Sequence, residues 1–248
     1  CRLDGKGLGE IFDAMVLGPH TDELIAQGFL SDFEVYAPKA PNLSQVHTRG
    51  GDYVSAELEA AMRKQVITGD SIKHYRKLAD GKSAVVFCVS VAHAEEVAQQ
   101  FRAAGYKFQS IDGKMSAEQR AALIKDMTDG RLQGLTSCDI ISEGTDIPRI
   151  EVAILLRPTK SMGLHRQQIG RGLRLFQGKQ KLIILDHAGN TLVHGLPQRH
   201  PLVEFESDPY DPDIVERGQG GTLRRRRWRD GGGRGRPRRD RPLRPLRA

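Results

Sequence analysis

Short apolar runs alternate with helical stretches along the middle of the chain. Residues 84–89 form a continuous apolar run of strand length, which is typical of a strand covered on both faces. Ser90 is placed to cap a helix over 92–104, and Gly105 is placed to end it. The same alternation predicts strands at 108–111, 132–137, 152–156 and 181–186, a helix from a capping box at Ser116–Gln119 to about Asp129, and a helix over 164–175.

Strands that alternate with helices of this length predict an α/β fold, with a largely parallel sheet sandwiched by helices. Parallel strands need right-handed crossovers, so the loops after their carboxyl ends share one edge, where a ligand is expected. Outside this region the pattern is weaker. It predicts short helices from Asp22 and from Ser55, a helix over 70–78 and a strand over 33–36, whereas 187–201 is loop-like.

Charge is unevenly distributed along the 248 residues, whose formal net charge is +7. Residues 217–248 contain 13 arginines and two acids, whereas the rest of the chain is mildly acidic. A composition of Arg, Gly and Pro cannot bury enough apolar area to offset its ordering entropy, so we expect a disordered basic tail within 201–248. Two interpretations of the tail stay open: a nucleic-acid-binding arm, or a truncated or frame-shifted end.

Apolar runs and cysteines limit the class of protein further. No apolar run approaches the roughly 18–20 residues of a membrane span, which excludes an integral membrane protein and predicts no membrane partner. Cys1, Cys88 and Cys138 are far apart and form no CxxC pair. This spacing argues against a disulfide scaffold or zinc site and favours a reducing compartment, the cytoplasm. Cys88 lies in an apolar run and is expected in the core.

The segment Gly81-Lys82-Ser83 matches the end of a phosphate-binding P-loop, but its setting does not fit. A P-loop follows a strand and opens a helix, so that its backbone N–H groups meet the phosphates. Here a helix precedes the segment and a strand follows it, and Arg76 stands where the first glycine is required. We therefore interpret the segment as a turn.

A helical segment from Gln167 to Arg174 is the first candidate for chemistry. Arg171 and Arg174 are three residues apart and share one helix face, with Gln167 one turn earlier. Two guanidinium groups on one face are best understood if they meet a polyanion, since Arg donates planar, bidentate hydrogen bonds to phosphate. A solvated basic face is the plainer alternative. Glycines at 170 and 172 favour the first interpretation, because Gly costs about 1 kcal/mol inside a helix and indicates close approach by another surface.

The loop over 142–148, just after a strand, is the second candidate. Gly144 permits a sharp turn with exposed N–H groups. Asp146 can accept hydrogen bonds from a sugar hydroxyl or pair with an arginine. Taken alone, this loop is generic.

In this order, the segments resemble the second RecA-like domain of superfamily 2 DEAD/DEAH-box-like helicases and translocases, of the bacterial and phage restriction-helicase type. Residues 85–90 resemble motif IV, 112–120 the turn that follows it, 139–148 motif V, and 167–174 the QxxGRxxR of motif VI. The opening CRLDGKGLGEIFD is similar to the stretch after motif III. The resemblance covers about residues 1–195 and implies the P-loop NTPase helicase C-terminal fold.

The resemblance also implies roles for single residues. In the family, ATP binds to the first domain and the second completes the site, so Arg171 and Arg174 are implied to reach the γ-phosphate, and Gln167 to help place the water or the arginines. Asp146 is implied to bind the ribose, with Glu143 and Gly144 shaping that loop. The nucleic-acid strand runs over the opposite edge, where the implied contacts are Ser90, Gly113, Lys114, Ser137 and Cys138, the last at a place where Thr is common.

The family's P-loop, its DE-x-H acids and its motif III precede this chain, so ATP and Mg²⁺ are expected as cofactors, with the metal on a missing first domain. We expect residues 1–50 to hold the end of that domain and a linker, 51–200 the second RecA-like domain, and 201–248 the tail. The predicted function is the C-terminal motor domain of an ATP-dependent helicase acting on DNA, with RNA as the open alternative, and the fragment alone is expected to be inactive. Competing hypotheses are a non-enzymatic nucleic-acid-binding α/β module with a basic arm and, ranked low, a doubly wound metabolic enzyme without a GxGxxG fingerprint.

Overall fold

A six-stranded sheet forms the centre of the molecule in the computed structural model, which describes residues 18–38, 40–63, 67–138, 147 and 149–197. Every neighbouring pair of strands in this sheet is parallel. The predicted α/β fold with a parallel sheet is therefore confirmed. In spatial order the strands are β1 (Asp32–Tyr36), β8 (Lys181–Asp186), β7 (Val152–Leu155), β4 (Ala84–Phe87), β6 (Gly134–Ser137) and β5 (Phe108–Ile111).

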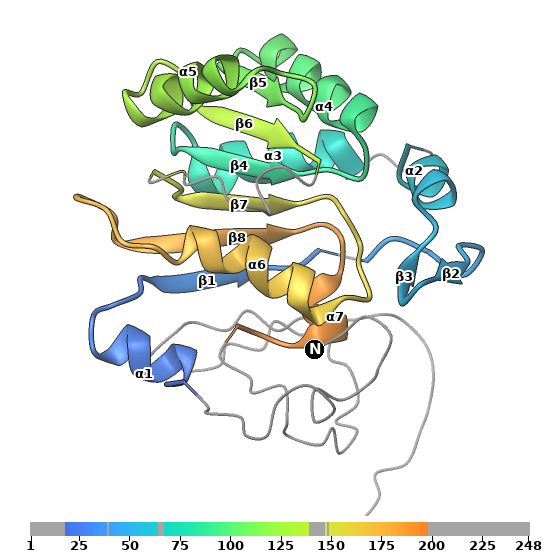
Figure 1. The fold of residues 1–248 in the computed structure, drawn as a ribbon, viewed down its shortest axis with the longest axis horizontal. Coiled ribbons are helices and arrows are strands. Elements are labelled where there is room, and N and C mark those ends of the chain that lie inside the picture. Colours follow the sequence, from blue (N-terminus) through green and yellow to red (C-terminus); the bar gives the residue numbers. More distant parts are fainter. Residues whose placement is uncertain (1–17, 39, 64–66, 139–146, 148, 198–248) are drawn as a thin grey trace, which may run out of the picture.

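Helices cover both faces of the sheet, as Figure 1 shows. On one face lie α5 (Ala117–Thr128) and α6 (Met162–Gly172), and on the other lie α3 (Ile67–Ala79) and α4 (Val91–Ala103). Alternate residues of a strand point to opposite faces, so Val85 joins the apolar core under α5 and α6, while Val86 joins the core under α3 and α4. This two-sided burial explains why the strand sequence is apolar throughout.

Local capping signals in the sequence form as predicted. The Ser90 hydroxyl accepts a hydrogen bond from the His93 N–H at 3.0 Å and caps α4. Ser116 and Gln119 form the reciprocal capping box of α5. Gly105 follows α4 with a φ of 93°, which only glycine adopts at little cost. The helix expected over 164–175 begins earlier, because Ser161 caps it by accepting a hydrogen bond from the Leu164 N–H, and it ends at Gly172.

The segment before residue 50 contributes to the main sheet, because β1 pairs with β8 and forms one of its edges. The expected division of the chain into residues 1–50, 51–200 and 201–248 stays a prediction. The stretch 187–201, expected to be loop, contains the short helix α7 (Asn190–His194). This helix forms because the buried Asp186 carboxylate accepts hydrogen bonds from the N–H groups of Ala188, Asn190 and Thr191.

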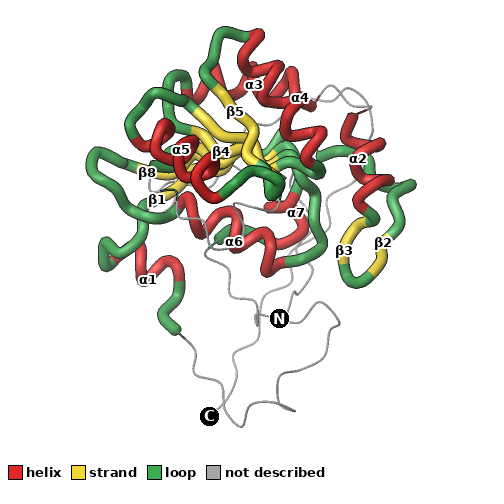
Figure 2. Tube along the Cα trace, turned by 45° about the horizontal axis from the view of Figure 1, so that its top comes forward, coloured by secondary structure: helices red, strands yellow, loops and turns green. Residues whose placement is uncertain are grey.

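A small unit precedes α3 and stands beside the main sheet (Figures 1 and 2). It consists of an antiparallel hairpin, β2 (Thr48–Arg49) and β3 (Asp52–Tyr53), followed by α2 (Ser55–Arg63). We call residues 42–63 the hairpin unit. Leu58 and Met62 of α2 pack against Val89, which follows β4 at the carboxyl edge of the sheet. A further short helix, α1 (Thr21–Ala26), precedes β1.

No helix among the described residues is both long enough and apolar enough to span a bilayer.

Candidate functional site

The five residues expected to contact nucleic acid all lie at the carboxyl edge of the sheet. They follow or end β4, β5 and β6, which are neighbours, so the topology brings their ends together. Asp112 shapes the turn after β5 by accepting hydrogen bonds from the N–H groups of Lys114 at 2.7 Å and Met115 at 3.2 Å. This turn leaves Gly113 and Lys114 exposed, and Lys114 supplies a positive charge there.

The other members of this group differ in accessibility. Ser90 and Cys138 are half-buried, and the Cys138 thiol donates a hydrogen bond to the Val89 carbonyl at 3.2 Å. Ser137 is only 1% exposed, so the structure gives its hydroxyl no surface from which to contact a strand. Cys88 is buried in the core as predicted, and burial raises the pKa of its thiol. Of the five residues, Lys114 and Gly113 are the best placed to meet a phosphate backbone.

The motif at the end of α6 lies away from these residues. The helix begins just after β7 at the carboxyl edge and ends at Gly172, beside Leu182 at the start of β8. Gln167 and Arg174 are exposed and Arg171 is half-buried, whereas Gln168 and Ile169 are buried against the sheet. The structure therefore places Gln167 and Arg171 one turn apart on α6 and Arg174 just after the helix ends, away from the carboxyl-edge group.

A lysine that the sequence analysis did not single out joins the arginines at the end of α6. The Lys179 ammonium donates hydrogen bonds to the carbonyls of Gly172 and Arg174, the latter at 3.0 Å. A cation at the carboxyl end of a helix is favoured by the helix dipole. Burial lowers the pKa of Lys179 to about 8. The only signal in the sequence was a basic residue shortly after a helix end, which is too common to be informative.

The two glycines of the motif have different surroundings. A Cβ added at Gly172 would lie 2.7 Å from Leu182 Cδ1, so contact with the sheet explains this glycine. At Gly170, which is exposed, an added Cβ would meet no atom within 4 Å among the described residues. The close approach predicted from both glycines is therefore internal at Gly172, and at Gly170 the described part of the chain offers no reason for it.

The residues expected at the nucleotide's sugar, Glu143, Gly144 and Asp146, lie outside the described residues. Ile147, the one described residue of the segment from 139 to 148, is buried in the core under α5 and α6. Within the described ranges, no three His, Cys, Asp or Glu side chains converge in a way that could hold a metal ion.

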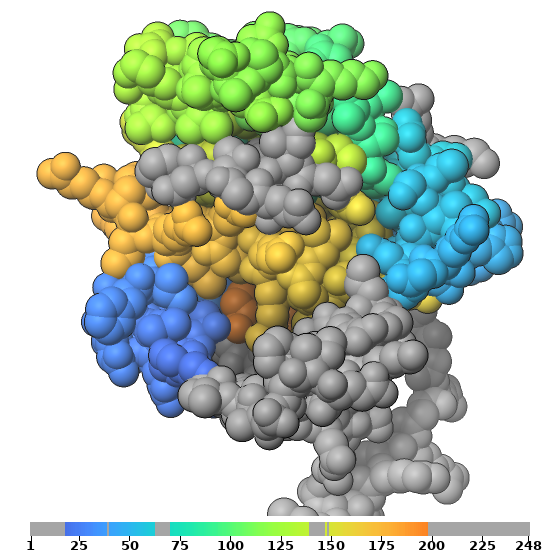
Figure 3. Space-filling model, in the orientation of Figure 1, coloured from blue at the N-terminus to red at the C-terminus, as the bar shows by residue number. Residues whose placement is uncertain are grey.

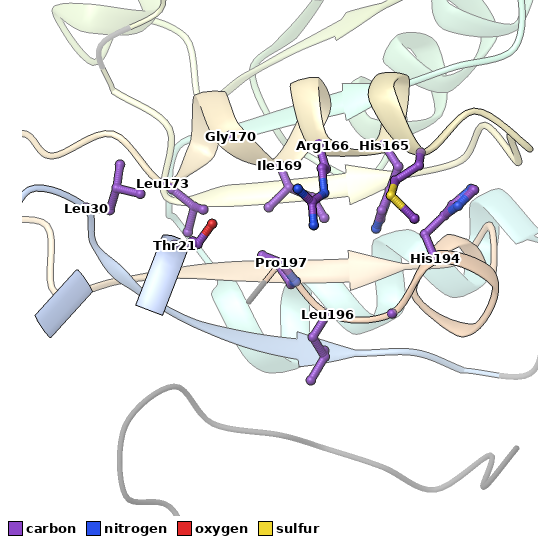
Figure 4. A pocket seen from close by; sticks show the side chains of 12 residues that line it. Thr21, Leu30, His165, Arg166, Ile169, Gly170, Leu173, His194, Leu196 and Pro197 are labelled. Atoms are coloured by element: carbon purple, nitrogen blue, oxygen red, sulfur yellow. The ribbon is translucent and has the colours of Figure 1, made fainter. Parts of the chain in front are cut away.

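A small groove of about 120 Å³ lies between α6, α1 and residues 194–197 (Figure 4). Its volume is well below the roughly 300–1,000 Å³ of pockets that bury a whole small molecule. His165 lines it and stacks on His194, with ring centroids 5.3 Å apart. Burial, with a further contribution from His194, lowers the pKa of His165 to about 3, so its ring is neutral at neutral pH. This groove cannot hold a nucleotide by itself.

Comparisons with known proteins find similarity to helicases. The family described as "Helicase conserved C-terminal domain" matches residues 65–176. A "51.5 kDa protein" of a Lactococcus phage is 34% identical over 199 residues, which are 80% of this chain and 44% of the phage protein. The "Putative ATP-dependent helicase IRC3" of Saccharomyces cerevisiae is 30% identical over 216 residues, 86% of this chain and 31% of the yeast protein. The chain thus spans less than half the length of these relatives.

One solved structure supports the fold over most of the chain. It is "The fragment structure of a putative HsdR subunit of a type I restriction enzyme from Vibrio vulnificus YJ016", with a TM-score of 0.59 and 20% sequence identity. The similarity covers 80% of this chain and 41% of that one. At this identity the likeness concerns the fold.

Proposed function

We propose that this chain carries the C-terminal RecA-like domain of a superfamily 2 helicase and acts as the second half of an ATP-dependent nucleic-acid motor. The observation that carries the proposal is the run of polar side chains at the end of α6: exposed Gln167 and half-buried Arg171 lie one turn apart on the helix, and exposed Arg174 follows its end. The carboxyl edge, with Lys114 exposed, provides a separate surface for the nucleic acid.

The first part of the proposal concerns ATP, which binds to a preceding domain. Arg171 and Arg174 face that domain and neutralise the charge that develops on the transferred γ-phosphoryl group. Gln167, one turn earlier, places the attacking water or the arginines. Asp146 binds the ribose, with Glu143 and Gly144 shaping its loop. The Mg²⁺ ion that accompanies ATP is held by the preceding domain.

Gly170 supports a second surface at this place. It lies between Gln167 and Arg171, it is exposed, and nothing described in this chain requires a glycine there. Glycine inside a helix costs about 1 kcal/mol relative to alanine. Close approach of the ATP-bearing domain to the backbone of α6 accounts for a glycine that the chain itself does not need.

The second part concerns the nucleic acid, which lies along the carboxyl edge and is held mainly by its phosphates. Lys114 and the backbone at Gly113 are exposed on the turn after β5, and Ser90 and Cys138 stand on the neighbouring strands. The burial of Ser137 makes it a support for this edge in the proposal, in place of a direct contact. Phosphate contacts of this kind are shared by DNA and RNA.

A motor completed with its ATP-binding domain tests the proposal. Replacing Arg171 with alanine should lower the turnover of ATP by at least about a hundredfold, because a transition-state contact is lost. Arg131→Ala is the matched control, since Arg131 is an exposed arginine that pairs with Asp126 and Asp129 beyond the end of α5. Unchanged turnover in Arg171→Ala would remove Arg171 from its role.

The chain by itself should hydrolyse no ATP above background, because the phosphate-binding and metal-binding parts lie on the other domain. Robust hydrolysis by the purified chain, lost in Lys82→Met, would contradict the proposal.

The uneven charge favours a second candidate function, a non-enzymatic nucleic-acid-binding module with a basic arm. The last 32 residues contain 13 of the 38 basic residues of the chain. Deleting residues 217–248 separates the two functions. If the deletion abolishes all nucleic-acid binding, together with its steep dependence on salt, the folded part is only a scaffold. If binding that depends on Lys114 remains, the carboxyl edge contributes as the motor requires.

A further inference from the structure

The loop between β7 and α6 is tied to distant parts of the chain through Thr159. This residue is 1% exposed, and each of its polar groups is used. Its N–H donates to Asn190 Oδ1 at 2.9 Å, and its carbonyl accepts from His194 Nε2 at 2.8 Å. Its hydroxyl donates to Asp52 Oδ2 at 2.7 Å and accepts from the Ser161 N–H at 3.0 Å. Thr159 therefore joins α7, the hairpin unit and the cap of α6.

The carboxylate of Asp52 is the connection to the hairpin unit. While one oxygen accepts from the Thr159 hydroxyl, the other accepts from the Lys160 N–H at 2.7 Å and from the Tyr53 N–H at 2.8 Å. The Lys160 ammonium lies over the Tyr53 ring, 5.1 Å from its centroid. Hydrogen bonds to an ionised carboxylate are stronger than those between neutral groups. A single side chain thus holds two consecutive residues of the loop that leads into α6.

The position of α6 depends on this loop. Ser161 caps the helix, and His165 in its first turn stacks on His194, which is itself bonded to Thr159. From Met162 to Gly172 the helix has 11 residues, so a tilt at its start moves the residues at its far end. Those residues include Arg171. Displacement of a reacting group by about 1 Å can cost a hundredfold in rate.

The hairpin unit also contacts the other surface of interest. Its helix α2 packs through Leu58 and Met62 against Val89, the residue before Ser90 at the carboxyl edge. In Figures 1 and 3 the unit projects from the side of the molecule at which the strands end. One small element therefore contacts both the edge assigned to nucleic acid and the loop that positions the arginines.

We propose that Asp52 is a positioning residue, which holds the start of α6 against the hairpin unit and so couples nucleic acid at the carboxyl edge to the arginines on α6. This inference rests on the proposed function. It adds a route by which a strand bound at one edge changes the rate of ATP hydrolysis at the other side of the domain.

The test uses the completed motor and compares ATP turnover with and without saturating single-stranded DNA. Asp52→Ala should reduce the stimulation by DNA at least about tenfold through kcat, with the KM for ATP changed less than about twofold, because the arginines are misplaced in the transition state. Asp52→Asn should restore much of the stimulation, since the amide oxygen accepts from the Lys160 N–H and the amide N–H donates to the Thr159 hydroxyl. Thr159→Val combined with Asp52→Ala should be no worse than Asp52→Ala alone, because both remove the same link.

Glu57→Gln is the matched control. Glu57 lies in the same hairpin unit, but its carboxylate accepts from His47 and contacts nothing in the loop before α6. This variant should keep full stimulation. If Asp52 has only a structural role, Asp52→Ala will lower the melting temperature and leave the stimulation of ATP turnover by DNA unchanged. That result overturns the proposal.

A second measurement works on the chain alone and covers the case in which Asp52→Ala hydrolyses no ATP at all. Hydrogen exchange at the amides of Leu164 and His165, in the first turn of α6, should quicken at least about tenfold in Asp52→Ala and return toward the wild-type rate in Asp52→Asn. Unchanged exchange overturns the proposal. If Arg171→Ala lowers turnover while Asp52→Ala keeps its stimulation, the coupling fails and the proposed motor function stands. If Arg171→Ala has no effect, Arg171 loses its role in the proposed motor, and this inference fails with it.

Discussion

The Glu151 carboxylate accepts two hydrogen bonds from Ser83, one from its N–H and one from its hydroxyl, both at 3.0 Å. The neighbouring Lys82 ammonium lies 3.3 Å from the other Glu151 oxygen, and Gly81 turns the chain with a φ of 74°. The segment Gly81-Lys82-Ser83 is thus a turn between α3 and β4, as predicted. The groups that would hold phosphate in a P-loop instead bind a carboxylate at the amino edge of the sheet.

Lys82→Met should therefore leave ATP turnover in the completed motor within about twofold of the wild type, since Lys82 forms a partly exposed ion pair worth at most about 1 kcal/mol. Steady-state ATP hydrolysis measures this effect. A loss comparable to that of Arg171→Ala would show that the turn binds nucleotide, contrary to its geometry.

Gly170→Ala should have opposite effects on stability and activity. In the chain alone, alanine should raise the free energy of unfolding by about 1 kcal/mol, because it is the better helix former and its Cβ meets no described atom. In the completed motor the same methyl group should lower turnover, since it blocks the approach of the first domain. Thermal unfolding of the chain and ATP hydrolysis by the motor measure the two effects.

Gly172→Ala is the comparison variant in α6. Its Cβ would lie 2.7 Å from Leu182 Cδ1, so it should lower the free energy of unfolding by about 1–3 kcal/mol. If Gly170→Ala leaves turnover unchanged, no second surface approaches α6 closely at that position.

Acid should destabilise the domain through two buried histidines. Burial lowers the pKa values of His165 and His187 to about 3, against about 6.5 for an unfolded histidine. Between these two pKa values the unfolded chain binds more protons than the folded chain. The contribution of the two histidines to stability is therefore complete above about pH 6.5 and is lost progressively as the pH falls toward 3. The slope for each histidine is up to about 1.4 kcal/mol per pH unit.

Urea unfolding at pH 7, 6 and 5 tests this prediction. His165→Phe should flatten the dependence of stability on pH relative to the wild type. The difference between variants isolates the histidine from the carboxylates that titrate in the same range. Parallel curves for wild type and His165→Phe would contradict the neutral, buried state of His165.

Gly134 should be the glycine of the sheet that least tolerates a side chain. A Cβ there would lie 2.3 Å from Phe108 Cε1 and 2.8 Å from the Ala84 carbonyl oxygen. Phe108 cannot move aside freely, because it stacks on Phe101 with centroids 4.1 Å apart. Gly134→Ala should therefore lower the free energy of unfolding by about 3 kcal/mol, measured by chemical denaturation. An effect below about 1 kcal/mol would mean that the Phe101–Phe108 pair rearranges easily.

Much of the central fold could be predicted from the sequence because its signals are local. The apolar run before Ser90, the cap at Ser90 and the capping box at Ser116 depend on neighbouring residues, and each forms as predicted. The placement of Gln167 and Arg171 one turn apart on α6 also follows from the helical repeat alone, whereas Arg174 lies just beyond the end of the helix. These features determined the fold class, and with it the edge at which the strand ends meet.

Contacts between residues that are far apart in the sequence became visible only in the tertiary structure. Strand β1 extends the sheet beside β8, although 144 residues separate Tyr36 from Lys181. The sequence pattern of neither strand indicates which strand it will pair with. Asp52 contacts Thr159, which lies 107 positions later in the sequence. The burial of Ser137 and the close contact at Gly172 come from neighbouring strands. Backbone hydrogen bonds within helices and the alternation of side chains along strands involve residues a few positions apart. The individual helices and strands could therefore be predicted from the sequence. Pairing between elements depends on how all of them pack around one core, which no local pattern contains.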